Sequence, residues 1–229
     1  TIFSFIPNTA ETAFYGLIKG AEAYLNEIKI QRIASWGTDI NEDKLREMIE
    51  RRVRIEKIAI KDVKLRTFIT EEGARNEMVQ HVYDVTYGTV QANVDTLVVI
   101  DDSIVRGTTL KQSILKILDR LDPKKIVVVS SAPQIRYPDC YGIDMSRMKE
   151  FIAFRAAIAL IKERKMENLL DQVYESCVSQ PYHSENFVKQ VYAPFTDEEI
   201  SDKVAEIVTT SEIKAEVKVI FQTVQNLHK

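Results

Sequence analysis

The chain has 229 residues, 28% of them charged, and a formal net charge of −3 at pH 7, which fits one large globular domain or one domain with a small appendage. The slightly negative charge argues against a nucleic-acid partner, and no apolar segment is long enough to span a bilayer. The two cysteines, Cys140 and Cys177, match neither metal-ligand spacing nor a disulfide framework. We therefore expect a cytoplasmic protein with reduced thiols.

The first third of the chain predicts a strand followed by helices. Residues 1–6 form an apolar strand pattern with no methionine and no leader before it, so we expect the chain to be part of a longer polypeptide. A turn at residues 7–9 precedes a helix over residues 10–27 with apolar side chains at four-residue spacing. Asn41 is the expected N-cap of a charged helix that extends to about residue 53.

The next segment carries weaker patterns. Residues 55–69 alternate irregularly, which predicts one or two strands. Residues 70–94 are polar with scattered aromatic side chains and no clear period, which indicates a long loop or hairpin. Long loops in compact domains often serve as lids, and we expect a lid here.

The most informative stretch is an apolar strand that ends on two adjacent acids. Residues 97–100 suit a buried parallel strand, and Asp101 and Asp102 follow it. Neighbouring carboxylates at a strand end are stable where ligand hydroxyls or a hydrated cation take up their lone pairs. The polar loop over residues 103–109 precedes a periodic helix over residues 110–121 and offers backbone N–H groups for a phosphate. A site that binds a diol beside a phosphate suits a ribose 5-phosphate.

The remainder continues the α/β pattern. A buried strand over residues 126–130, a loop over 132–143 and a helix over 146–164 complete a parallel unit. Thr196 and Glu199 form a capping box, and the apolar spacing over residues 213–227 predicts a final amphipathic helix. We expect a parallel sheet with helices on both faces in a domain over residues 1–165, and a helical appendage over residues 166–229.

The sequence VVIDDSIVRGTT over residues 98–109 resembles the phosphoribosyl pyrophosphate (PRPP) signature of the type I phosphoribosyltransferases. Its second half is closely similar to the branch of glutamine PRPP amidotransferases. Three further segments are similar in the same order: residues 5–9 to the pyrophosphate turn, residues 66–69 to the opening of the flexible catalytic loop, and residues 131–145 to the block after the next strand. The similarity spans about residues 1–160.

The resemblance implies roles for named residues. Asp101 and Asp102 would hold the ribose hydroxyls and Mg²⁺, and Arg66 and Thr67 would act in the catalytic loop. The 5-phosphate cradle and the pyrophosphate turn would consist of Ser103, Ile104, Val105, Arg106, Gly107, Thr108 and Thr109, and of Pro7, Asn8 and Thr9.

The same resemblance implies the reaction and its partners. Ammonia would displace pyrophosphate from PRPP to give 5-phosphoribosylamine, a step of purine biosynthesis. An N-terminal glutaminase domain of the parent polypeptide would make the ammonia, and the chain would be a homo-oligomer.

Three departures from the family pattern leave alternatives open. Asn8 stands where the family has an acid in the pyrophosphate turn, and Ala10 stands where the family has a hydroxyl residue. The basic stretch of the family's lid is replaced by QHVYD over residues 80–84. Because pyrophosphate is strongly anionic, this loss of positive charge favours a PRPP- or nucleotide-sensing domain as one alternative. A salvage phosphoribosyltransferase that acts on a base is another. Arg136 and Tyr137 either shape the nucleophile side of the pocket or belong to a solvated loop.

Overall fold

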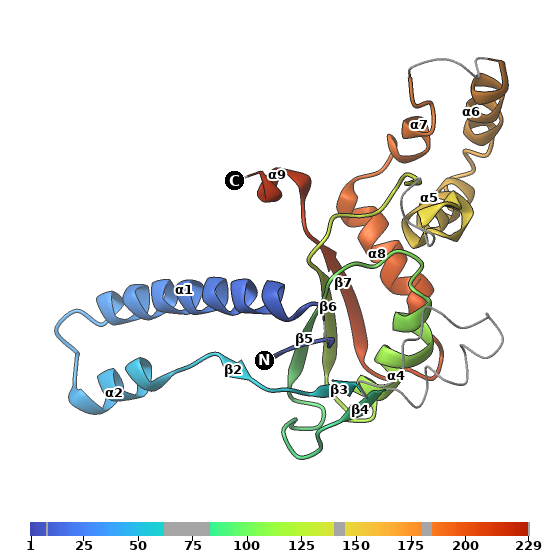
Figure 1. Cartoon of the computed structure of the whole chain (residues 1–229). Coiled ribbons are helices and arrows are strands. Elements are labelled where there is room, and N and C mark those ends of the chain that lie inside the picture. The colour runs from blue at the N-terminus through green and yellow to red at the C-terminus, as the bar shows by residue number, and fades with distance from the viewer. Residues whose placement is uncertain (8, 62–82, 140–144, 180–184, 229) are drawn as a thin grey trace.

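A five-stranded parallel sheet forms the centre of the molecule (Figure 1). The computed structural model describes residues 1–7, 9–61, 83–139, 145–179 and 185–228. The strand order is β2-β1-β5-β6-β7, and every adjacent pair is parallel. The strands are β1 (Ile2–Phe5), β2 (Arg54–Ile55), β5 (Thr96–Asp101), β6 (Lys125–Ser130) and β7 (Glu216–Phe221).

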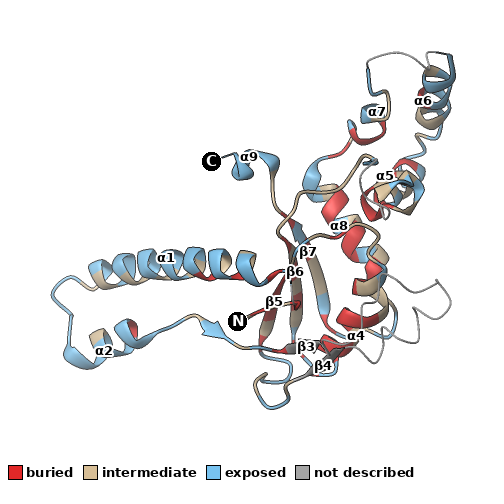
Figure 2. Cartoon of the chain, in the orientation of Figure 1, coloured by how far each residue is buried: buried red, intermediate tan, exposed pale blue. Residues whose placement is uncertain are grey.

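Helices cover both faces of this sheet, as the apolar strands require. On one face, α1 (Glu11–Ser35) buries Phe14 and Ile18 against Ile100. The other face holds the larger core, drawn red in Figure 2. The elements on that side are η1 (Leu110–Ile114), α4 (Leu115–Asp119), α5 (Ile152–Glu163) and α8 (Asp197–Val208). The predicted parallel α/β fold with helices on both faces is confirmed.

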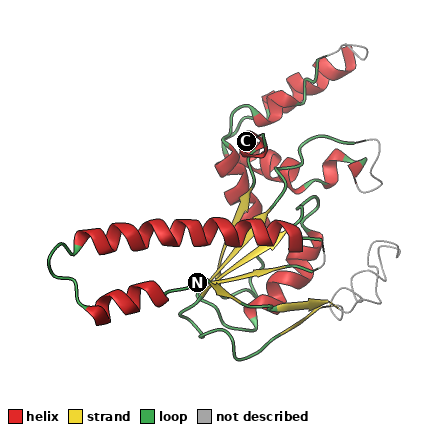
Figure 3. Ribbon diagram, turned by 60° about the vertical axis from the view of Figure 1, so that its left-hand side comes forward, coloured by secondary structure: helices red, strands yellow, loops and turns green. Residues whose placement is uncertain are grey.

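The α1 helix extends well beyond the sheet and is followed by α2 (Glu42–Glu50), which lies beside it (Figure 3). The Asn41 side chain accepts a hydrogen bond from the Lys44 N–H at 2.9 Å, so the predicted N-cap is confirmed. The helix predicted over residues 10–27 is longer than expected, because α1 continues to Ser35.

Two short strands, β3 (Ala59–Lys61) and β4 (Tyr83–Val85), pair antiparallel beside the main sheet. The predicted lid over residues 70–94 lies partly outside the described residues, because residues 62–82 are not described. Its role as a lid stays a prediction.

The final helix predicted over residues 213–227 is wrong. Residues 216–221 form β7, which pairs with β6 along its whole length, and only the short helix α9 (Val224–Leu227) follows. The apolar side chains of this segment fit both a helical period and a strand alternation, and pairing with the exposed edge of β6 selects the strand.

The remaining elements of the last third are α6 (Asn168–Ser179), α7 (Lys189–Tyr192) and a 3₁₀ turn, η3 (Met148–Glu150), before α5. The predicted capping box at the start of α8 is confirmed. The domain boundary predicted at residue 166 stays a prediction, although α8 and β7 beyond it share the core of β5 and β6. No helix in the described part of the chain is long and apolar enough to cross a membrane.

Candidate functional site

The predicted acids lie where the topology of the sheet changes direction. From β1 the order runs to β2 on one side and to β5, β6 and β7 on the other, so the crevice between the ends of β1 and β5 is the switch point. Ligands of open parallel sheets bind outside the carboxyl ends of the strands at such a point. Here the Thr9 hydroxyl donates a hydrogen bond to the Asp102 carboxylate. The structure thus brings together the predicted turn after β1 and the acids after β5.

The two acids are held by their own backbone and by the end of β6. The Asp101 carboxylate accepts from the Asp102 N–H at 2.9 Å, and the Asp102 carboxylate accepts from the Ser103 N–H at 2.7 Å. The Ser131 hydroxyl donates to the Asp102 carbonyl at 2.9 Å, and the Ser131 N–H to the Asp101 carbonyl at 2.9 Å. Because Asp102 is exposed and Asp101 partly exposed, both carboxylates can meet a ligand.

The loop after the acids leads directly into a helix. Thr108 begins the helical stretch and is exposed, whereas Ile104 is buried and can reach a ligand only through its backbone. The Lys111 N–H donates to the Gly107 carbonyl at 2.9 Å and closes the first turn. The N–H groups of this turn, together with the Ser103, Thr108 and Thr109 hydroxyls, suit a phosphate oxygen.

The structure explains why a glycine stands at position 107 in a way that the sequence did not indicate. Its φ is +70°, and an added Cβ would lie 3.2 Å from side-chain carbons of both Ile152 and Val208. The loop therefore packs against α5 and α8 at a place where a side chain would crowd both helices. Close approach of a phosphate, the reason expected from the sequence, is an additional role that stays a prediction.

Arg106 is oriented toward η3. Its guanidinium lies 2.8 Å from the Glu150 carboxylate, which Arg147 also approaches at 3.5 Å. This ion pair ties the middle of the loop to the turn before α5, and the Ile152 N–H donates to the Val105 carbonyl at 2.8 Å beside it. The loop thus has fixed backbone contacts on both sides.

The other predicted site residues divide into two groups. Pro7 is buried after β1, next to the Ile6 N–H that donates to the Ile100 carbonyl at 2.9 Å. Asn8, Arg66 and Thr67 lie outside the described residues, so the structure does not place them.

Arg136 and Tyr137 pack on Tyr192 of α7. The Tyr192 hydroxyl donates to the Arg136 carbonyl at 2.9 Å, and the Arg136 guanidinium lies over the Tyr192 ring, 5.0 Å from its centroid. Tyr137 meets the same ring edge to face, and burial raises the pKa of the Tyr192 phenol. These side chains therefore fix the loop after β6 to the helical part, and a freely solvated loop is ruled out for them.

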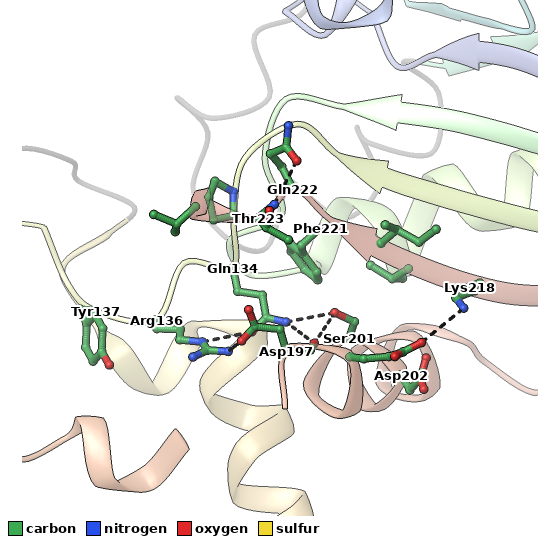
Figure 4. Close-up of a pocket in the computed structure, with 15 residues that line it drawn as sticks. Gln134, Arg136, Tyr137, Asp197, Ser201, Asp202, Lys218, Phe221, Gln222 and Thr223 are labelled. Atoms are coloured by element: carbon green, nitrogen blue, oxygen red, sulfur yellow. Dashed lines mark hydrogen bonds and ion pairs between the residues drawn. The ribbon is translucent and has the colours of Figure 1, made fainter. Parts of the chain in front are cut away.

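A cavity of about 590 Å³ lies beside this loop, between the start of α8 and the end of β7 (Figure 4). Gln134 donates to the Asp197 carbonyl at 2.7 Å and to the Ser201 hydroxyl at 3.0 Å, and Arg136 pairs with the Asp197 carboxylate at 2.5 Å. These polar groups bond to one another, so they chiefly hold the loop against α8. The sequence did not predict this cavity, because the strand that forms one of its walls was expected to be a helix.

The acid pair also bears on metal binding. The described residues contain no cluster of three acidic, histidine or cysteine side chains that could hold a metal alone. Mg²⁺ is commonly bound by one or two carboxylates together with substrate phosphates, and Asp101 and Asp102 keep oxygen lone pairs for this purpose. The donor set therefore fits a Mg²⁺ ion that arrives with a phosphorylated ligand.

The fold and the loop define a class of protein: an open parallel α/β domain with two strand-end acids and a helix start at its switch point. No family model matches the chain. Curated relatives over shorter segments are amidophosphoribosyltransferases. That of Pasteurella multocida is 50% identical over 58 residues, 25% of this chain and 11% of the relative. That of Escherichia coli is 42% identical over 67 residues, which are 29% of this chain and 13% of the relative. That of Saccharomyces cerevisiae is 35% identical over 86 residues, which are 35% of this chain and 17% of the relative.

Two solved structures are similar over more of the chain. One, described as the allosteric regulatory enzyme of purine biosynthesis, has a TM-score of 0.49 and 21% identity and covers 99% of this chain and 31% of its own. The other is the glutamine PRPP amidotransferase of B. subtilis with ADP and GMP. It has a TM-score of 0.41 and 20% identity, and the match covers 93% of this chain and 35% of that structure's chain. The resemblance to the glutamine PRPP amidotransferases predicted from residues 98–109 is thus confirmed by the curated relatives. The matches span less than a fifth of the length of the three curated relatives described above.

Proposed function

We propose that this chain carries the PRPP-binding, phosphoribosyl-transferring part of an amidophosphoribosyltransferase. The observation that carries the proposal is the hydrogen bond from Thr9 to Asp102, which lies beside the loop over residues 103–109. It joins the turn after β1 to a pair of strand-end acids, next to the N–H groups of a helix start. A ligand with a diol between two phosphorylated ends matches this order of groups.

Each end of PRPP has an expected position. The 5-phosphate accepts hydrogen bonds from the backbone N–H groups of residues 103–109 and from the Ser103, Thr108 and Thr109 hydroxyls. The ribose hydroxyls donate to the carboxylates of Asp101 and Asp102. The pyrophosphate extends toward the turn at Pro7 and Thr9.

A Mg²⁺ ion bound with PRPP would be held by Asp101 or Asp102 and the substrate oxygens, and it would neutralise negative charge on the pyrophosphate. In the reaction, a C–N bond forms between ammonia and ribose C1 while the bond from C1 to the pyrophosphate oxygen breaks. The nitrogen then passes a proton to the departing pyrophosphate or to water, which leaves the neutral amino group of 5-phosphoribosylamine. The carboxylates near the sugar tolerate the positive charge that grows on the ring.

The remaining predicted partners form part of the same proposal. Ammonia comes from a glutaminase domain of the parent polypeptide, the product enters purine biosynthesis, and the protein acts in the cytoplasm as a homo-oligomer. Arg66 and Thr67 act at the base of the catalytic loop.

One observation favours a second candidate function. Ala10 is fully buried against α1 and offers no hydroxyl where the resembling family has one. A site with fewer donors at its pyrophosphate end suits a domain that binds PRPP or a nucleotide and does not turn it over. Salvage transfer to a base remains the third alternative from the sequence.

One assay separates the three functions. The protein is incubated with PRPP and Mg²⁺, and pyrophosphate release is followed with ammonium, with a purine or pyrimidine base, or with neither. Release that depends on ammonium supports the proposal, and release only with a base supports the salvage alternative. Calorimetric binding of PRPP without release in any arm supports the sensing alternative, and absence of both binding and release overturns all three.

A further inference from the structure

The outer part of α1 and the α2 helix extend away from the sheet as an arm, defined here as residues 20–50 (Figures 1 and 3). The arm has little core of its own, and most of it is exposed in Figure 2. The buried residues of α1 are Phe14 and Ile18, which lie at the sheet, and within α2, which is described in full, only Met48 is buried. Because helices in proteins gain most of their stability from packing of an apolar face, this arm has room for a further packing partner.

A groove of about 480 Å³ lies between the two helices of the arm. One wall consists of residues at four-residue spacing along α1 and just beyond it: Ile28, Arg32 and Trp36. The other wall comes from one face of α2: Lys44, Glu47, Met48 and Arg51. Spacings of three and four residues keep each wall on one face of its helix. The groove therefore extends over about 12 Å, or two helical turns.

The apolar part of the groove consists of Ile28, Trp36 and Met48. Ile28 is 40% exposed and Trp36 is partly exposed, so both offer apolar surface to a partner, whereas Met48 is buried beneath them. Tryptophan, methionine and arginine are enriched where proteins bind one another. The composition of the groove is thus that of a protein-binding surface.

The charged part of the groove has three cations and one carboxylate, so it attracts an acidic partner. Arg32 is exposed, and it forms no ion pair with another described residue. Lys44 pairs with Asp39 at 2.8 Å. Arg51 pairs with Glu47 at 3.1 Å, and every side chain in these two pairs is at least 44% exposed. Exposed pairs of this kind contribute little free energy, so carboxylates of a partner can replace them.

We propose that the groove of the arm binds an acidic amphipathic helix of another protein. The apolar side chains of that helix, three or four residues apart, pack on Ile28, Trp36 and Met48, as in other helix-in-groove complexes. Its flanking carboxylates pair with Arg32 and Arg51, whose guanidinium groups can each hold a carboxylate through two hydrogen bonds. The proposal does not rest on the function proposed above, because no residue of the groove belongs to the predicted PRPP site.

The single tryptophan of the chain makes the groove directly measurable, because all tryptophan fluorescence comes from Trp36. The probe is a synthetic helical peptide of about 15 residues without aromatic side chains, with leucine along one face and glutamate on both sides of it. At low salt its titration should shift the emission to shorter wavelength with a dissociation constant below about 100 μM, because the leucines exclude water from the indole. The same peptide with lysine in place of glutamate should bind at least about tenfold more weakly.

Charge reversal in the protein provides the second arm of the test. R32E/R51E should weaken binding of the glutamate peptide at least about tenfold. The same variant should gain binding of the lysine peptide, a result that a misfolded arm could not give. K19E/R46E is the matched control, because it reverses one exposed charge on each helix outside the groove, and it should bind the glutamate peptide as the unaltered chain does.

Several results would overturn the proposal. One is the absence of both an emission shift and calorimetric heat with glutamate peptide up to about 1 mM. Equal binding of the two peptides to the unaltered chain is another, as is a reversed variant that keeps the glutamate peptide or fails to gain the lysine peptide. Self-association that R32E/R51E abolishes, without binding of the glutamate peptide, would assign the groove to a second copy of the chain instead.

Discussion

The Thr9 hydroxyl donates a hydrogen bond to the Asp102 carboxylate, although the two residues are 93 positions apart in the chain. This contact joins the ends of β1 and β5, which are neighbours in the sheet. It fixes the side chain of the second acid while the Ser103 N–H holds its other oxygen at 2.7 Å. Contacts within the protein thus position the acid that the proposal assigns to the ribose.

Replacing both acids tests the proposed ligand. D101N/D102N keeps the size of both side chains and removes two negative charges. Because a hydrogen bond to a charged group contributes about 1.5–3 kcal/mol, PRPP affinity measured by calorimetry with Mg²⁺ should fall at least about tenfold. Folding should be unharmed, since repulsion between the carboxylates disappears. Asp39→Asn, an exposed acid at the far tip of the α1–α2 pair, is the matched control and should bind PRPP normally. Unchanged affinity in the double variant would place the site elsewhere.

The packing of Gly107 predicts a loss of stability in Gly107→Ala. Its φ of +70° disfavours alanine, and the new methyl group would meet Ile152 and Val208 at 3.2 Å. We expect the free energy of unfolding, measured in urea, to fall by about 1–3 kcal/mol. Gly20→Ala is the control, because nothing lies near its Cβ position in α1, and it should stabilise the chain by about 0.5–1 kcal/mol. Equal effects of the two substitutions would refute the packing argument.

Asp119 anchors the start of β7. Its carboxylate is buried and accepts from the Lys214 N–H at 3.1 Å and the Ala215 N–H at 3.0 Å. Asp119→Asn replaces one acceptor oxygen by a donor that faces those N–H groups. Stability should fall by about 1–3 kcal/mol, whereas the exposed Asp202→Asn should change it by less than about 0.5 kcal/mol. Hydrogen exchange of the β7 amides should rise in Asp119→Asn, and unaltered protection there would contradict this role.

Asp95 predicts a specific response to acid. Burial opposes ionisation of this carboxyl, but the Gln91 N–H at 2.9 Å and the Arg54 guanidinium at 2.7 Å outweigh it and hold the pKa of Asp95 below its usual range. The unfolded chain therefore binds this proton more readily than the folded chain does. Its stabilising contribution is complete above about pH 4 and is lost as the pH falls through the lower folded pKa.

Asp95→Asn should thus reduce stability at pH 7 and flatten the decline of stability below about pH 4. Glu56→Gln, which alters an acid two residues beyond Arg54, should retain the steep decline. Urea unfolding at a series of pH values measures both. If the free energy of unfolding of Asp95→Asn falls with pH as steeply as that of the unaltered chain, carboxyls other than Asp95 govern the decline.

The sequence by itself determined the elements whose cause is local. The apolar run that ends at Asp101 predicted β5, and Asn41 and Thr196 predicted helix starts that the structure confirms. In each case the deciding interaction lies within a few residues: a side chain that caps the next turn, or an apolar run whose length suits one strand. The resemblance over residues 98–109 rests on the same kind of local information.

Only the tertiary structure decided what depends on distant partners. Residues 213–227 fit a helix as well as a strand, and the free edge of β6 selected β7. Gly107 meets α5 and α8, and Thr9 meets Asp102, because the sheet order sets those elements side by side. Such contacts follow from the sum of many weak long-range packing terms, and no short stretch of sequence contains that sum.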